Sequence, residues 1–342
     1  MNEPFISVII TAHDRKKFII NAILSVLNQD LERENFEVLI VKNFNDARID
    51  NFIETENLLS IYTDSISLGQ KLALGIRKSK GEVISFLEDD DLWATNKLTT
   101  VMEQFKKDSS VGYYKNSIVY IDKEGNELPQ QITSHFSDTL PASNKYNSYG
   151  VTTILQLLSV GAGYHLSSIS IRRDIVLSFI DAIESTNVGQ DLLMLFFALE
   201  SKSVLLIDSR PLCLYRLHNS SSNDLQNYNS FIVSKQKLFS GALKTMLTLD
   251  DYCNLDSLKH VLSYIVANYK CYLALITMDD NITISERLRS LKLSIRVKDI
   301  TGLLVLGLFI PKIGKGTRPL GNLFRYVYYL MLRKFYRSLG VI

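Results

Sequence analysis

Cysteine is scarce in this sequence, and long apolar runs are missing. Only three cysteines occur among 342 residues, and their spacing fits neither a disulfide framework nor a zinc site. This usage is typical of a reducing compartment, and the N-terminus shows no secretory pattern, so we expect a cytoplasmic location. The apolar stretch at residues 301–311 is shorter than the ~20 residues that a membrane-spanning helix needs.

Charge is distributed unevenly along a chain that is 46% hydrophobic, enough to bury a large core. Residues 287–342 contain twelve Lys and Arg but one acid, and thus carry +11, which leaves −9 for residues 1–286. The basic tail indicates an anionic partner. Aromatic and basic residues in 322–342 favour a membrane surface, with packing on the body or an oligomer contact as alternatives. We expect no nucleic acid, because no base-stacking platform accompanies the tail.

Short apolar segments alternate with helical patterns through the first part of the chain. This order predicts a doubly wound sheet with helices on both faces. The polar stretch at 219–224 marks the expected boundary between a domain at 1–222 and a helical C-terminal region at 223–342. The segments expected as strands are residues 5–12, 36–44, 59–64, 81–89, 111–122, 165–171, 203–208 and 212–218.

Polar clusters follow three of the expected strands. They are His13-Asp14, Lys42-Asn43 and the acidic run in FLEDDDLW, residues 86–93. Ligands of doubly wound sheets bind beyond the carboxyl ends of the strands, so these clusters are expected to converge on one edge. Asp14 is also a plausible N-cap for the helix expected at 17–30.

The acidic run places four carboxylates, Glu88 to Asp91, directly after a buried strand. Like charges in a row require open water or a cation, and carboxylate oxygens suit Mg²⁺ or Mn²⁺. Strand alternation predicts that Glu88 and Asp90 share one face and that Asp89 and Asp91 share the other. The alternative interpretation is a solvated turn that caps the following helix.

Four stretches in this order resemble the family 2 glycosyltransferases, which are inverting enzymes of the GT-A fold. They are ISVIITAHDR, SKGEVISFLEDDDLW with the preceding Gly75-Ile76, NVGQDLLMLFFAL and YRLHNSSS. The resemblance covers residues 5–222. It implies a GT-A fold, which is a Rossmann-like, doubly wound mixed sheet, followed here by a C-terminal helical region.

The resemblance also implies roles for individual residues. Asp90 would bind the metal, with Glu88 in place of the first acid of the family's Asp-x-Asp element. Asp191 would be the catalytic base, and Arg216 and His218 would contact the diphosphate or the metal. Further positions expected to line the nucleotide-sugar site are Thr11, His13, Asp14, Asn43, Lys71, Glu88 and Asp89.

This chain departs from the family pattern at several of these positions. Lys42-Asn43 replaces an acidic pair that contacts the base, and Gln190 replaces the Glu before Asp191. The Ala-Arg-Asn that precedes Gly75 in the family reads Lys71-Leu72-Ala73 here, and Lys71 or Lys42 is expected to compensate near the phosphates. Each of these residues also has a plain structural interpretation, such as a helix cap for Asp191 or a solvated side chain for the lysines.

The resulting hypothesis is a metal-dependent inverting hexosyltransferase. It would use a UDP- or GDP-sugar and a glycan or polyprenyl-linked acceptor, with the tail held peripherally on the cytoplasmic face of the membrane. One alternative is a non-catalytic nucleotide-sugar-binding or scaffold protein of the same fold. Another is a sugar nucleotidyltransferase, but TAHDRKK lacks the glycine-rich loop that such an enzyme needs.

Overall fold

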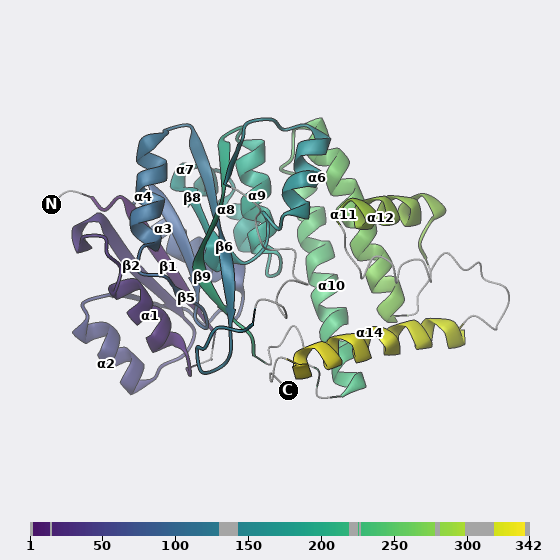
Figure 1. Cartoon of the computed structure of the whole chain (residues 1–342), viewed down its shortest axis with the longest axis horizontal. Coiled ribbons are helices and arrows are strands. Elements are labelled where there is room, and N and C mark those ends of the chain that lie inside the picture. Colours follow the sequence, from purple (N-terminus) through teal and green to yellow (C-terminus); the bar gives the residue numbers. More distant parts are fainter. Residues whose placement is uncertain are drawn as a thin grey trace. The chain divides into compact units, whose positions relative to one another are not determined.

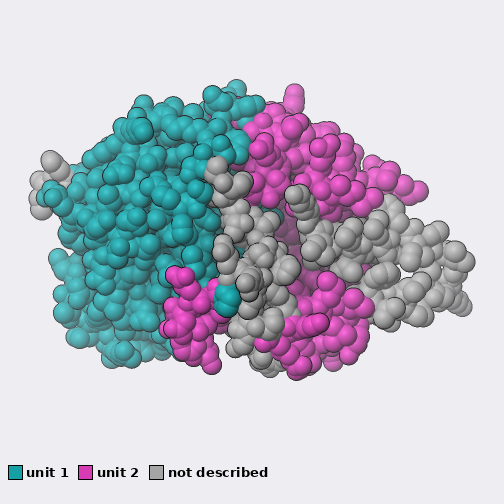
Figure 2. Space-filling view, viewed as in Figure 1, with its two compact units in different colours: residues 1–121, 129–148, 161–216 teal, residues 122–128, 149–160, 217–342 magenta. Residues whose placement is uncertain are grey.

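The computed structural model describes residues 3–13, 16–129, 143–218, 225, 227–277, 281–297 and 318–338. The chain divides into two compact units, coloured separately in Figure 2. Residues 1–121, 129–148 and 161–216 form the first unit, and residues 122–128, 149–160 and 217–342 form the second. The chain therefore passes between the units more than once. The expected domains 1–222 and 223–342 remain a prediction about which parts fold separately.

The first unit is built on a nine-stranded mixed sheet with the order β3-β2-β1-β4-β8-β6-β9-β5, and β7 pairs with β9 (Figure 1). The first four strands in this order run parallel, whereas β8 is antiparallel to both of its neighbours. The predicted mixed, doubly wound sheet is confirmed. The strands are β1 (Ile6–Ala12), β2 (Phe36–Lys42), β3 (Leu59–Tyr62), β4 (Val83–Glu88), β5 (Leu92–Trp93), β6 (Val111–Ile121), β7 (Asn144–Tyr146), β8 (Ile169–Arg172) and β9 (Val204–Arg216).

The helices of this unit follow the apolar periodicity of the sequence. Close packing explains two glycines of α3: a Cβ on Gly75 would lie 2.8 Å from the Ile9 side chain, and one on Gly69 would lie 2.0 Å from the Thr186 carbonyl oxygen. The helices are α1 (Ile19–Leu27), α2 (Ala47–Thr55), α3 (Leu68–Lys78), α4 (Lys97–Lys107), α7 (Arg173–Ser178), α8 (Ile180–Ser185) and α9 (Gln190–Glu200), with 3-10 turns at Arg33–Asn35 and Leu166–Ser168.

Three local predictions are wrong. The two strands expected at 203–208 and 212–218 are one continuous strand, β9. The strand expected at 165–171 begins with the 3-10 turn Leu166–Ser168, because His165 before it adopts a left-handed conformation with φ 62°. Asp14 lies outside the described residues, and the residue that caps α1 is Phe18, which makes no side-chain capping bond.

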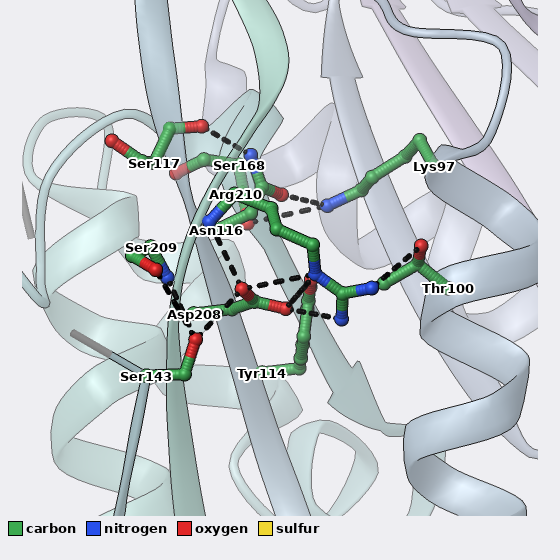
Figure 3. Close-up of polar contacts among 10 residues, drawn as sticks. All are labelled: Lys97, Thr100, Tyr114, Asn116, Ser117, Ser143, Ser168, Asp208, Ser209 and Arg210. Atoms are coloured by element: carbon green, nitrogen blue, oxygen red, sulfur yellow. Dashed lines mark hydrogen bonds and ion pairs between the residues drawn. The ribbon is translucent and has the colours of Figure 1, made fainter.

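A buried polar network ties β6, β9 and α4 together (Figure 3). Asp208 on β9 accepts hydrogen bonds from the Tyr114 hydroxyl at 2.8 Å and from Arg210 Nη2 at 2.6 Å. Lys97 on α4 donates to Asn116 Oδ1 and, at 3.4 Å, to the Ser168 carbonyl oxygen. Burial, together with the nearby Lys115, lowers the pKa of Lys97 to about 7, against the opposing effects of Cys213 and Asp208.

The second unit is helical, which confirms the predicted C-terminal helical region. Its helix α12 begins with a capping box, in which Thr283 and Glu286 satisfy each other's backbone N–H groups. Phe239, Cys271, Tyr272 and Ile276 form one apolar cluster of this unit. In the part of the chain that the structure describes, no helix is long and apolar enough to span a membrane. The helices are α6 (Val151–Ser159), α10 (Tyr228–Asp250), α11 (Asp256–Thr277), α12 (Ile284–Arg296) and α14 (Arg318–Ser338).

Candidate active site

A buried lysine joins the carboxyl ends of β1 and β2. Lys71 lies on α3, and its Nζ donates to the Ala12 carbonyl oxygen at 2.8 Å and to Asn43 Oδ1 at 3.0 Å. The same Nζ lies 3.2 Å from His13 Nδ1. Three candidate residues from separate elements therefore meet at this edge of the sheet. Thr11, also a candidate, is buried near the end of β1.

Lys42 serves a different purpose from the one expected. Its buried Nζ lies 2.9 Å from Asp50 Oδ1 and donates to the Phe44 carbonyl oxygen at 2.8 Å. These contacts fix the loop between β2 and α2. Of the two lysines expected to compensate near the phosphates, Lys71 is therefore the one that lies beside other candidate residues.

The acidic run forms a turn and not a continued strand. β4 ends at Glu88, so the predicted alternation of the four carboxylates does not extend past that residue. Asp89 is fully buried and its Oδ2 accepts the His13 N–H at 3.1 Å. Asp91 is also fully buried: its Oδ2 accepts from the Ser167 hydroxyl at 2.6 Å and its Oδ1 from the Arg216 N–H at 2.9 Å.

Arg216 is bound to the acidic turn by its side chain as well as by its backbone. Its Nε donates to the Asp90 carbonyl oxygen at 2.8 Å, and its guanidinium lies 4.5 Å from the centre of the Phe18 ring. Asp90 is almost fully buried, and Glu88 is half-buried. The end of β9 thus holds an arginine directly against the end of β4.

Asp91 has a structural role that sequence reasoning missed. Burial, together with the adjacent Asp90 carboxylate, raises the pKa of Asp91 to about 8, against the opposing effect of its hydrogen-bond donors. The Ser167 hydroxyl that binds it also accepts the Glu88 N–H at 3.0 Å, and the Ser167 carbonyl oxygen accepts the Trp93 Nε1–H at 2.7 Å. Ser167 was not a candidate, and no local sequence signal marks it, since its partners lie more than seventy residues away.

Asp191 lies in the first turn of α9. The cap of this helix is Gly189, whose φ is 77°, and it makes no side-chain capping bond. Asp191 Oδ2 accepts the His165 N–H at 3.1 Å, and Oδ1 accepts the Leu192 N–H at 3.0 Å. Burial raises the pKa of Asp191, while the nearby His165 opposes this rise. The carboxyl is therefore moved towards the range in which a general base works.

One short segment, residues 165–168, connects Asp191 to the acidic turn. His165 at its start donates to Asp191, and Ser167 binds Asp91 and the Glu88 N–H. Two residues of chain reach at most about 7 Å, so the Asp91 and Asp191 carboxyls lie within about 16 Å of each other. The structure therefore brings Asp191, the acidic turn and Arg216 into one region of the first unit.

The structure bears on the predicted metal ligands only in part. Among the described residues, no three His, Cys, Asp or Glu side chains gather as a metal-binding group. The carboxylates of Glu88 and Asp90 still fit a cation such as Mg²⁺, which proteins hold through one or two carboxylates together with substrate phosphates. His218 belongs to the second unit, two residues after Arg216, and its proposed role as a metal ligand stays a prediction.

Residues 7–176 match the family model described as glycosyl transferase family 2. The chain belongs to this family. An uncharacterized glycosyltransferase of Rickettsia bellii is 32% identical over 141 residues, which are 40% of this chain and 20% of that relative. Because the match spans only a fifth of that relative, it says nothing of substrates for either protein.

Solved structures of the GT-A fold resemble this family 2 glycosyltransferase in architecture. S. aureus TarS 1-349 in complex with UDP-GlcNAc superposes with a TM-score of 0.56 at 14% identity and covers 97% of this chain and 91% of its own. Mannosyltransferase PcManGT from Pyrobaculum calidifontis, in complex with GDP-Man and Mn²⁺, superposes with a TM-score of 0.51 at 13% identity, covering 98% and 88%. At such identities the likeness shows the fold, and the GT-A prediction is confirmed.

Proposed function

We propose that this chain is a metal-dependent inverting glycosyltransferase that moves a hexose from a nucleoside-diphosphate sugar to an acceptor hydroxyl. The observation that carries the proposal is the 165–168 segment, which holds Asp191 at one end and the acidic turn at the other. A base and a diphosphate-binding turn must lie on opposite sides of one sugar ring for direct displacement. Family membership supports the same reaction.

The donor site extends along the ends of β1, β2 and β4. Lys71 holds His13 and Asn43 at this edge, which we assign to the nucleotide together with Thr11 at the end of β1. Asp14 lies outside the described residues, and its role in nucleotide binding stays a prediction. Asp89 shapes the same edge of the sheet through the His13 N–H, a positioning role consistent with its full burial. The TarS and PcManGT complexes with UDP-GlcNAc and GDP-Man support a UDP- or GDP-hexose donor.

Asp90 and Glu88 would hold Mn²⁺ or Mg²⁺ together with the donor phosphates. When bound, the cation supplies neutralisation of the charge that develops on the leaving diphosphate. Arg216 adds a fixed positive charge beside the turn, because its Nε bond to the Asp90 carbonyl oxygen orients the guanidinium. The Mn²⁺ in the PcManGT complex supports a divalent ion.

Asp191 would act as the catalytic base. Its carboxylate takes the proton of the acceptor hydroxyl while the acceptor oxygen forms a bond to the anomeric carbon and the carbon–oxygen bond to the diphosphate breaks. This displacement inverts the anomeric centre. The hydrogen bonds from the His165 and Leu192 N–H groups hold the carboxylate in place without consuming all of its acceptor sites.

The acceptor that we favour is a glycan or a polyprenyl-linked glycan at the cytoplasmic face of the membrane, with no role for nucleic acid. Helix α14 packs through Tyr329, which contacts Phe231, whereas its Leu330 and Met331 side chains are about half exposed. The buried Tyr329 fits the packing alternative, and the exposed apolar side chains fit peripheral membrane contact. The apolar stretch 301–311 lies outside the described residues.

The alternative function is a nucleotide-sugar-binding protein without catalysis. Gln190, which replaces the family's Glu, is buried and donates to the Thr186 carbonyl oxygen at 3.0 Å and to its hydroxyl at 2.9 Å. This residue therefore serves the packing of α8 against α9. A member of the family that had lost turnover would retain the donor site and this packing.

A two-part experiment tests the proposal. The first part is a thermal-shift screen of UDP-, GDP- and dTDP-sugars with and without Mn²⁺, because a ligand of the native state raises the melting midpoint. The second part measures slow Mn²⁺-dependent hydrolysis of the donor found. A shift with hydrolysis supports the enzyme, and a shift without hydrolysis favours the non-catalytic alternative. If no sugar nucleotide shifts the midpoint at millimolar concentration, both are wrong.

A further inference from the structure

A basic pocket of about 410 Å³ lies within the second unit, lined by α6, α11 and α12. Its size falls in the range of about 300–1,000 Å³ that is usual for small-ligand sites. Its lining has no acidic residue among those the structure describes. The lining residues are Val151, Thr152, Leu155, Gln156, Ser159, His260, Tyr264, Lys292 and Arg296.

Hydrogen bonds organise one wall of this pocket. The Tyr264 hydroxyl lies 2.8 Å from His260 Nε2 and accepts from Lys292 Nζ at 3.1 Å. Lys292 and Arg296 stand one turn apart on α12, so both cations face the same wall. Two cations beside several hydroxyl and amide donors suit the oxygens of a phosphate group.

The outward surface of α12 is apolar where a surface helix is normally polar. Ile284, Leu288 and Ile295 lie within a narrow arc at helical spacing and are 75%, 55% and 63% exposed. We call these three residues the α12 stripe. The opposite face is buried through Ser290, Leu293 and Ser294. The described residues of the chain therefore leave the α12 stripe open.

The charge of α12 matches an anionic surface. It carries four basic residues, Arg287, Arg289, Lys292 and Arg296, and one acid, Glu286. Glu286 is already engaged, since it pairs with Lys270 at 2.6 Å and completes the capping box. An exposed apolar stripe flanked by basic side chains is the pattern of helices that lie in a membrane interface.

We propose that α12 docks on an anionic phospholipid surface, with the α12 stripe in the interface and a headgroup phosphate in the basic pocket. This inference deepens the proposed membrane association and rests on it, but it does not require the transfer chemistry. It also adds a second contact, in addition to the one expected from residues 322–342, and assigns it to named residues. In this arrangement one helix, α12, supplies both the apolar contact with the membrane, through the α12 stripe, and the contact with the phosphate, through Lys292 and Arg296.

The test measures partition of the full chain onto phosphatidylcholine vesicles with and without phosphatidylglycerol. The L288Q/I295Q variant removes apolar contact with the membrane. We expect roughly 100-fold weaker vesicle binding, about 10-fold for each apolar side chain that no longer buries its exposed half in the interface. The K292Q/R296Q variant should bind about 25-fold more weakly, from about five-fold for each basic residue at an anionic surface. The difference in vesicle binding between K292Q/R296Q and the wild type should become smaller at higher salt concentration, because salt screens the charges.

Matched controls lie on α10 of the same unit. V233Q/L247Q changes two exposed apolar residues, and K237Q/K244Q changes two exposed lysines. We expect both controls to bind vesicles like the wild type, with all variants melting normally and giving the same donor-induced thermal shift. A failed donor shift would count against the proposed function, whereas the vesicle result addresses only α12.

Three outcomes would overturn the inference. In the first, the α12 variants bind vesicles as tightly as the wild type, which leaves residues 322–342 as the expected membrane contact. In the second, L288Q/I295Q converts a dimer to a monomer in sedimentation without weakening vesicle binding, which makes the stripe a subunit interface. In the third, inorganic phosphate binds the pocket and K292Q/R296Q abolishes that binding with no effect on vesicles, which makes the pocket a site for a free phosphate compound.

Discussion

The two units of this chain handle charge in opposite ways. In the first unit, acidic residues gather at the end of β4, and backbone N–H groups, a serine hydroxyl and Arg216 hold them at fixed distances. In the second unit, basic residues are spread along α12 beside exposed apolar side chains. A buried charge needs specific partners, whereas a single exposed charge contributes little and several must act together. The first arrangement is suited to catalysis, and the second to binding an extended charged surface.

The largest effect that we expect tests the role of Asp191 in the first unit. Asp191→Asn should lower kcat by about 100- to 10,000-fold, the usual contribution of a general base, because an amide takes no proton. Donor affinity, measured by calorimetry, should change little. Asp181→Asn, at an exposed position on α8, is the matched control and should keep full activity. Full turnover of Asp191→Asn would remove Asp191 from the base role.

The second prediction concerns the partners of Asp91. Asp91→Ala leaves the Ser167 hydroxyl and the Arg216 N–H without an acceptor in a buried region, at a cost of about 1–3 kcal/mol each. We expect the free energy of unfolding, measured in urea, to fall by that amount per group. Ser167→Ala removes the hydroxyl that donates to Asp91 and accepts the Glu88 N–H, so it should also lower the free energy of unfolding. Equal stability of Asp91→Ala and the wild type would contradict this account.

The third prediction uses Lys97, whose pKa burial lowers to about 7. The unfolded chain holds this proton up to about pH 10.4, so between pH 7 and 10 the unfolded state binds more protons than the folded state. Stability should therefore rise with pH there, by up to about 1.4 kcal/mol per pH unit from this group. The measurement is urea unfolding across this range for the wild type and Lys97→Met. The rise should be weaker in Lys97→Met, and an identical pH dependence would contradict the prediction.

The smallest effect that we expect concerns the pH profile of transfer. With Asp191 as the proposed base, only its ionised form would be active, so kcat/KM should rise with pH through a pKa above that of an ordinary carboxyl, because burial raises it. His165 opposes this rise, so His165→Asn should move the acidic limb to higher pH. The Asn side chain tolerates the left-handed backbone at this position. An unmoved limb in His165→Asn would show that the ring does not influence the base.

Most of the sheet could be predicted from the sequence, because β1, β2 and β4 are short, mostly apolar runs of the kind that form buried strands. β9 was divided in two because Asp208 to Pro211 interrupts its apolar run. In the structure these residues form an irregularity in the pairing with β6, where the register shifts around Asn116 and Ser117. A bulge is a property of two paired strands, and one strand's sequence does not display it.

The candidate site could be predicted in part. The resemblance to family 2 glycosyltransferases pointed to Asp90, Asp191 and Arg216, and the structure brings their regions together. Sequence reasoning missed the Ser167 hydroxyl and the fully buried state of Asp89 and Asp91, because these depend on contacts between residues far apart in the chain. Lys42 and Lys71 had equal standing in the sequence, and only the structure separates them by their hydrogen bonds.

The segment 165–168 has a consequence for how the enzyme tolerates change. Because the same few residues anchor Asp191 and the acidic turn, a displacement of this segment carries both along with it. The proposed base and the proposed diphosphate-binding turn would therefore keep their spacing when the surroundings shift. We expect a substitution that displaces the backbone of this segment to disturb catalysis and donor binding together, unlike a side-chain change that leaves the backbone in place.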